Sequence, residues 1–466
     1  MTVPPRSRGS ARVRAEHSYF ARRLLLPAQT FIHAQAVSAI VLLAAALAAV
    51  VWANSPWSES YEDLWTHVIV LDLGIFSIEE SAHRWSSDGL MVLFFFVVAL
   101  EIKRELVHGE LSSRRKAMLP VAGALGGMVL PAAIYLLFNA GGQGERGWGI
   151  PMATDTAFAL GVLALVGRRI PAEVRVFLLA LAIVDDIGAI LVLAVFYTES
   201  VSVAALAIAL LLLALIALMN RIGVTSLTPY FVVGAFIWVA FLKSGIHATI
   251  AGVMLGALAP ATPYLAKDIF MERAGTLLRR LKTATMQDDQ EGAETVLGEI
   301  EELTTAVEAP VDRLVRILQP WISYGVVPIF ALANAGIVIT GDAVRDAATS
   351  SVTFGIILGL LVGKAVGITS VAWLAVRFGI ASMPKRMNWL QLASIGMVAG
   401  MGFTVSLFFT EISFGGVAPT SDAKMGIFSA SIVAGVLGYL MLRWSWRDAK
   451  PEKTPALEVR ESLGGG

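Results

Sequence analysis

Residues 179–190 read LALAIVDDIGAI, a stretch that places two adjacent carboxylates, Asp185 and Asp186, inside a long apolar run. The run extends from about residue 172 to 197, roughly 39 Å of α-helix, which is enough to cross a bilayer with some tilt. A charged residue at mid-membrane depth costs roughly 2.5–3.5 kcal/mol on insertion scales, so such residues usually face an internal cavity. The pair therefore indicates either a binding site for a cation or protons, or a structural pair neutralised by a neighbouring helix.

The composition is that of a polytopic membrane protein. Of the 466 residues, 56% are hydrophobic and 15% are charged, whereas soluble domains carry about 25% charged residues. The chain has no cysteine, which excludes disulfides, thiol catalysis and iron–sulfur ligation, and its six histidines lack the spacing of a zinc site. We expect no cofactor, and the net charge of zero gives no indication of a nucleic-acid partner.

The hydropathy pattern predicts an all-α membrane protein with twelve transmembrane helices. Their expected ranges are 36–54, 88–107, 117–138, 150–166, 172–197, 202–220, 226–242, 246–263, 320–339, 353–378, 390–413 and 425–443. With the amino terminus inside, 30 of the 36 Lys and Arg residues fall in cytoplasmic segments, 5 fall outside, and one, Lys364, lies within a helix. Since cytoplasmic loops carry the excess of Lys and Arg, both termini are predicted to be cytoplasmic.

Segments outside the helices have distinct characters. Residues 1–35 form an Arg-rich cytoplasmic arm before the membrane domain of residues 36–443, and residues 444–466 form a polar tail that we expect to be disordered. Residues 264–312 are rich in Glu with helical periodicity, which predicts a solvated cytoplasmic helical hairpin. The alternating run 67–78 around a Leu-Gly turn signal favours an external β-hairpin, whose edge could pair with a second copy, although a plain surface loop is an equal alternative.

Two of the expected membrane helices are interrupted. Residues 150–166 contain Pro151, two threonines and Asp155, and residues 390–413 contain three glycines before a Phe-Thr-Val-Ser sequence. Non-helical backbone at membrane depth is tolerated only where it lines a cavity or is buried in protein. Each break falls in the second helix of a three-helix group, and matched interruptions in two halves point to a transporter built from inverted repeats.

Four ionisable residues lie at mid-membrane depth: Asp155, Asp185, Asp186 and Lys364. Adjacent residues on a helix do not face the same way, so one aspartate of the pair can bind Lys364 while the other faces the break at Thr154. Asp155 can neutralise the positive ends of the half-helices and Lys364 the negative ends. The oxygens of Asp185, Asp186 and Thr154 suit a hard cation such as Na⁺ or Li⁺. A purely structural charge network is the alternative.

Two further groups are candidates for ion entry or a response to pH. Glu101, Arg104 and Glu105 follow one another at helical spacing near the cytoplasmic end of the second helix and share a face. An ordinary interfacial charge cluster is an equal explanation for them. His247 opens the eighth helix, where a structural role competes with a contact that titrates near neutral pH.

At these residues the chain resembles a known family, the NhaA Na⁺/H⁺ antiporters of bacterial inner membranes. The resemblance covers about residues 36–443 and is carried by residues 153–161 (ATDTAFALG), 182–189 (AIVDDIGA), the Gly363-Lys364 pair and residues 400–404 (GMGFT). It implies twelve helices with two interrupted, crossed helices. It also implies electrogenic exchange of Na⁺ or Li⁺ for protons by a multi-pass inner-membrane protein that serves sodium and pH homeostasis.

The resemblance also assigns roles to residues. It implies Asp186 as the principal ion and proton carrier and Asp185 as its partner, paired with Lys364, while Thr154 and Asp155 belong to the crossed-helix site. The external hairpin is similar to the family's contact in a homodimer. One departure concerns a Glu-His pair and a further His that the family carries before the ninth helix, where this chain has Val315, Arg316 and Gln319. Strong activation at alkaline pH is therefore in doubt.

Three other functions compete with antiport. An ion channel would conduct without proton coupling. An intramembrane aspartyl protease, the enzyme alternative, needs two aspartates that face each other from separate helices, whereas Asp185 and Asp186 are neighbours on one helix. A carrier of organic anions is the alternative within the transporter class. We expect a membrane antiporter and no enzyme.

Overall fold

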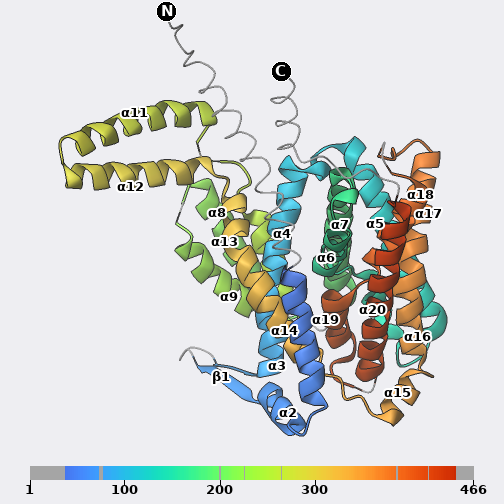
Figure 1. Cartoon of the computed structure of the whole chain (residues 1–466). Helices are drawn as coiled ribbons and strands as arrows, with labels where there is room; N and C mark the ends of the chain where they lie inside the picture. Colours follow the sequence, from blue (N-terminus) through green and yellow to red (C-terminus); the bar gives the residue numbers. More distant parts are fainter. Residues whose placement is uncertain are drawn as a thin grey trace, which may run out of the picture. The chain divides into compact units, whose positions relative to one another are not determined.

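The structure, a computed structural model, describes residues 37–72, 77–198, 201–224, 226–263, 265–384, 387–417 and 419–447, and it is predominantly helical (Figure 1). The expected amino-terminal arm and nearly all of the expected tail lie outside these residues. The chain divides into two compact units. The first comprises Met1–Ala48, Met118–Asp185 and Ile337–Gly466, and the second comprises Ala49–Ala117 and Asp186–Gly336.

The first unit is built from long apolar helices and several shorter ones. The described part of its first helix is Val37–Ala53, of which the residues up to Ala48 belong to this unit. Helix α7 belongs to this unit up to Asp185. The remaining elements are α5 (Arg114–Asn139), η3 (Glu145–Met152), α6 (Thr156–Val166), η4 (Gly167–Arg169), α7 (Ala172–Phe196), α15 (Gly341–Ala347), α16 (Ser351–Leu358), η6 (Gly359–Gly363), α17 (Lys364–Arg377), α18 (Trp389–Ala399), α19 (Phe403–Phe414) and α20 (Pro419–Ser445).

Glycines let two helices of this unit approach backbone to backbone. Gly126 of α5 and Gly367 of α17 lie so close that a Cβ added at either position would overlap the carbonyl oxygen of the other. Small residues at helix interfaces are how membrane helices gain van der Waals contact, because lipid tails are as apolar as the helices themselves. This contact brings Lys364, at the start of α17, alongside α5.

Both interruptions that the sequence predicts are present in the first unit. The backbone leaves helical geometry at residues 153–155, between η3 and α6. It does so again at residues 400–402, where α18 and α19 meet at an angle of 49°. The two breaks contact each other, because the backbone N–H of Asp155 donates to the carbonyl of Met401 at 2.6 Å.

The second unit combines membrane helices with two projecting hairpins. Its elements are α2 (Ser58–Thr66), β1 (Val68–Asp72), β2 (Ser77–Ser81), α3 (Ala82–Arg84), η1 (Trp85–Leu90), α4 (Met91–His108), η2 (Glu110–Ser112), α8 (Val203–Arg221), α9 (Thr228–Ser244), α10 (Thr249–Leu258), α11 (Lys267–Met286), α12 (Gln290–Val307), α13 (Pro310–Trp321), η5 (Ile322–Val326) and α14 (Val327–Asn334). Helix α4 packs against both α10 and α13.

The expected β-hairpin is confirmed. Strands β1 and β2 pair antiparallel, with Val68 opposite Ser81 and Asp72 opposite Ser77. The Leu-Gly turn itself lies outside the described residues. All five residues of β1 are exposed, including the apolar side chains of its first four positions. The strand therefore presents apolar surface that its own sheet does not cover.

Residues 264–312 contain the two helices α11 and α12, which pack against each other beside the membrane helices of the second unit (Figure 1). Leu277, Val296 and Leu303 form the buried core of this pair. Their helical spacing explains why the segment folds, since each helix buries one apolar stripe and exposes its charged face.

By length and apolar composition, seven described helices can cross a membrane, and the number rises to nine if each of two bent pairs is one span. The bent pairs are Val37–Ala53 with Ser58–Thr66 and Trp389–Ala399 with Phe403–Phe414. The chain is therefore a multi-pass membrane protein. Helices α9 and α10 are apolar but shorter, so the number of twelve spans stays a prediction.

We predict that Gly367→Ala lowers the melting temperature of the protein in detergent. The added methyl group collides with the backbone of α5, and overpacking of this kind costs about 1–3 kcal/mol. Gly275→Ala in α11 is the matched control, since no atom lies within 4 Å of a Cβ there, and replacing a helical Gly by Ala gains up to about 1 kcal/mol. Equal melting temperatures for the two variants would contradict the close approach of α5 and α17.

Candidate functional site

The break before α6 ends at Asp155, which caps that helix. Oδ1 of Asp155 accepts hydrogen bonds from the backbone N–H groups of Ala157 and Phe158 at 3.1 and 3.2 Å. The first N–H groups of a helix have no acceptor within the helix and carry partial positive charge. A buried carboxylate at this position therefore satisfies two donors and balances their charge.

The same carboxylate also binds the start of α19. Oδ2 of Asp155 accepts from the backbone N–H of Thr404 at 3.1 Å and from the hydroxyl of Thr404 at 2.5 Å. Asp155 thus joins the amino-terminal ends of two half-helices that are about 250 residues apart in sequence. Both of its oxygens are occupied by protein donors, which gives Asp155 a structural task at the meeting point of the two breaks.

A buried ion pair lies beside the breaks. Nζ of Lys364 lies 2.7 Å from Oδ2 of Asp185, and the two side chains are 0% and 1% exposed. The aliphatic stem of Lys364 passes Gly127 of α5, where a Cβ would lie 3.5 Å from its Cδ. Two charges removed this fully from solvent persist only as a pair, because each alone would carry a large desolvation cost.

Thr154 extends this pair to the breaks. Its Oγ1 lies 2.7 Å from Oδ2 of Asp185 and 3.0 Å from the carbonyl oxygen of Ala399, the last residue of α18. A hydroxyl has one hydrogen to donate, so it serves one of these two acceptors at a time. The other oxygen of the carboxylate, Oδ1 of Asp185, is buried and has no hydrogen-bond partner among the described residues.

From the sequence we expect one aspartate to bind Lys364 and the other to face Thr154. In the structure, Asp185 makes both contacts. It binds Lys364 and Thr154 through one oxygen, Oδ2. Asp186 is the next residue of α7 and is half-buried. Since α-helical residues are about 100° apart around the axis, Asp185 and Asp186 leave the helix in different directions.

The other candidate residues lie in the second unit. Glu101, Arg104 and Glu105 are half-buried on one face of α4, and Oε2 of Glu105 accepts from the backbone N–H of Glu110 at 3.0 Å. His247 is half-buried two residues before α10 begins. The proposed roles of these residues in ion entry or the response to pH stay predictions.

The residues that replace the family's Glu and His cluster have local roles. Val315 is buried in the core between α4 and α13. Arg316 forms a two-pronged ion pair with Glu308, with nitrogen–oxygen distances of 3.1 and 2.7 Å. The chain thus has a surface ion pair at this place.

Two partners of the site were not expected from the sequence. Thr404 follows the glycine break, and a hydroxyl at a helix start is a recognisable capping signal. The carbonyl of Ala399 has no such signal, because it becomes available only when α18 ends. Outside the site, Nζ of Lys103 donates to the carbonyl of Ala257 at the end of α10, at 2.6 Å.

The chain is similar to known Na⁺/H⁺ antiporters. Residues 29–442 match the family model described as Na⁺/H⁺ antiporter 1. The chain is 44% identical over 436 residues to the Na(+)/H(+) antiporter NhaA of Oleidesulfovibrio alaskensis, covering 92% of this chain and 96% of the relative. It is 43% identical to the protein of that name from Koribacter versatilis, over 93% and 95%, and 41% identical to that from Janthinobacterium, over 98% and 100%.

We predict that Lys364→Met lowers the free energy of unfolding by about 3–5 kcal/mol, because it leaves the Asp185 carboxylate buried without its counter-charge. The double variant Lys364→Met with Asp185→Asn is the control, since it removes both charges and should recover most of the loss. The measurement is thermal unfolding in detergent. Equal destabilisation by the single and double variants would show that the loss arises from the missing lysine stem and not from the stranded charge.

Proposed function

This chain belongs to the Na⁺/H⁺ antiporter 1 family, and we propose that it exchanges Na⁺ for H⁺ at the carboxylates of Asp185 and Asp186. Its relatives are antiporters, that is, transporters and not enzymes. The family membership makes the chain a Na⁺/H⁺ antiporter. The residues that carry the ions, and the route of the exchange, are our proposal.

One observation carries the assignment of the site. Oδ1 of Asp185 is buried and has no hydrogen-bond partner among the described residues, although buried polar atoms are almost always paired. A carboxylate oxygen in this state has a lone pair ready for a cation or a proton. The hydroxyl of Thr154 can turn its own lone pair to the same cation by donating its hydrogen to Ala399 instead.

The charges around this oxygen explain why the exchange is coupled. Asp155 is balanced by the ends of α6 and α19, and Asp185 is balanced by Lys364. At mid-membrane depth the sequence places three carboxylates, Asp155, Asp185 and Asp186, against one base, Lys364. Either Na⁺ or protons neutralise the surplus negative charge, and repulsion between the positive charges prevents the site from holding both fully. Binding of one cargo therefore releases the other.

We further propose that Li⁺ follows Na⁺, since carboxylate, hydroxyl and carbonyl oxygens suit hard cations in general. The contacting breaks support a pair of crossed helices, in a bundle of twelve with inverted repeats, that exposes the site alternately to each side. The resemblance to the family implies that the exchange would be electrogenic, because the protein would move unequal amounts of charge in the two directions. Exchange of this kind would serve sodium and pH homeostasis.

The placement of the protein in the cell is part of the proposal. We place it in the bacterial inner membrane with both termini in the cytoplasm, on the strength of the Lys and Arg distribution. We propose a homodimer joined through the external hairpin, because β1 exposes four consecutive apolar residues, Val68–Leu71, along a free strand edge. Glu101, Arg104, Glu105 and His247 would tune ion entry or the response to pH.

We predict that Asp186→Asn abolishes Na⁺-dependent proton movement while the protein still folds and inserts. Removing a charge at membrane depth carries no insertion cost, but an amide neither binds a proton at neutral pH nor neutralises Na⁺. The measurement is Na⁺-driven proton release in everted vesicles. Asp422→Asn, at a half-buried position in the first turn of α20, is the matched control and should leave exchange intact. Normal exchange by a well-expressed Asp186→Asn protein would refute the site.

Competition for one site predicts the dependence of exchange on pH. Where the site is protonated, Na⁺ must displace a proton, so the apparent KM for Na⁺ should rise about tenfold per pH unit for each proton displaced. The maximal rate should change much less. Titrations of Na⁺ at several pH values in proteoliposomes test this. A constant KM with a collapsing maximal rate would indicate a separate gating sensor and would contradict direct competition.

A further inference from the structure

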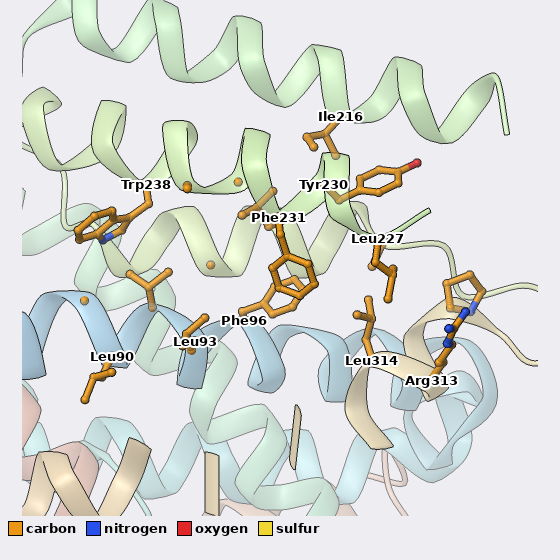
Figure 2. Close-up of a pocket in the computed structure, with 18 of the residues that line it drawn as sticks. Leu90, Leu93, Phe96, Ile216, Leu227, Tyr230, Phe231, Trp238, Arg313 and Leu314 are labelled. Carbon is orange, nitrogen blue, oxygen red and sulfur yellow. The ribbon is translucent and has the colours of Figure 1, made fainter. Parts of the chain in front are cut away.

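A large apolar groove lies within the second unit, separate from the residues of the ion site. It has a volume of about 1280 Å³ and runs along α4, with α9, α10 and α13 as further walls (Figure 2). Leu93 and Phe96 of α4 and Phe231 of α9 line its middle. Ligand pockets usually measure about 300–1,000 Å³, so the groove is large enough for a long amphiphile.

The two ends of the groove differ in chemistry. One end is closed by aromatic rings, since Trp85 and Trp238 lie with their centroids 5.7 Å apart. The other end holds Arg313, and Figure 2 shows Trp238 and Arg313 at opposite ends of the lining. A groove that changes from aromatic to charged along its length matches a molecule with a polar head and an apolar tail.

The side chain of Arg313 is available to bind a ligand. It is half-buried, and its guanidinium has no hydrogen bond or ion pair among the described residues. Its neighbour Arg316, one helical turn further along α13, is by contrast paired with Glu308. A guanidinium offers five N–H donors in a planar fork that fits a phosphate with two parallel hydrogen bonds.

Acidic side chains at the same end of the groove indicate which second group a phosphate-containing headgroup would carry. The charged residues that line the groove are Arg313, Glu301, Glu302 and Glu308. Glu308 is engaged by Arg316, whereas Glu301 and Glu302 of α12 are exposed. Among the described lining residues, Arg313, Glu301 and Glu302 have no charged partner. One cation beside two anions disfavours a headgroup of purely negative charge, but it complements a headgroup that holds a phosphate and a protonated amine.

We propose that the groove binds a phospholipid with a primary-amine headgroup, phosphatidylethanolamine, as a fixed part of the protein. The phosphate binds Arg313, the ammonium donates to Glu301 and Glu302, and an acyl chain lies along Leu93, Phe96 and Phe231. Choline lipids carry the same charges but no N–H on the quaternary nitrogen, so they cannot make the second contact. The site is independent of the ion-carrying residues, so its test does not depend on transport.

Lipid retention by the purified full-length chain tests the site. The protein is washed in lipid-free detergent, incubated with equal amounts of phosphatidylethanolamine, phosphatidylcholine, phosphatidylglycerol and cardiolipin, washed again and analysed by native mass spectrometry. We expect one phosphatidylethanolamine per chain, with a preference over phosphatidylcholine of about tenfold or more. Arg313→Gln should lower this retention about tenfold.

Two further variants make the test specific. Arg280→Gln removes an exposed arginine of the adjacent α11 that does not line the groove, and it should retain the lipid as the unmodified chain does. Leu93→Trp fills the groove from a partly exposed position, and it should displace the acyl chain while Arg313 is intact. Each variant is first shown by its melting temperature to be folded.

Three outcomes would overturn the proposal. Equal retention by Arg313→Gln and Arg280→Gln would show that the guanidinium does not hold the lipid. Equal retention of all four lipids would mean that only the ordinary lipid shell is present. Stronger retention of phosphatidylglycerol or cardiolipin would show that the groove selects net negative charge, against the assigned role of Glu301 and Glu302.

Discussion

The buried ion pair between Lys364 and Asp185 is the interaction on which the rest of the site depends. At 2.7 Å and without solvent contact, it fixes α17 against α7 and orients one carboxylate. Because Lys364 and Thr154 both bind Oδ2, the other oxygen of Asp185 is left without a partner among the described residues. The pair thus orients the site, and the attraction between its two charges offsets part of their desolvation cost.

The interrupted helices impose a second electrostatic constraint, because the N–H groups at their starts need acceptors. Two helix starts meet in the interior, where their N–H groups have no water to bind, and the single carboxylate of Asp155 satisfies donors from both. This explains why an acid occurs inside a short apolar segment. Of the three aspartates that the sequence places at membrane depth, Asp155 stabilises the breaks, Asp185 pairs with Lys364, and Asp186 follows Asp185 on α7.

Much of this arrangement was predictable from the sequence, because charge at membrane depth and broken periodicity are local signals. Asp185, Asp186 and Lys364 stand out within apolar runs, and Pro, Thr and Gly mark both breaks. The residues alone did not decide which aspartate binds Lys364, since that depends on how α17 is rotated against α7. The carbonyl of Ala399, and the lack of a partner for Arg313 in the part of the chain that the structure describes, could not be predicted from the sequence, because both depend on tertiary packing.

The two acceptors available to Thr154 have a consequence for timing. Switching its hydrogen from Asp185 to Ala399 requires only rotation of a hydroxyl, with no movement of heavy atoms. Rotations of this kind take picoseconds to nanoseconds, whereas rearrangements of packed helices take microseconds to milliseconds. The switch of this hydrogen is then complete long before the helices move. In the proposed exchange, the hydroxyl of Thr154 therefore adds no delay to the movement of the helices.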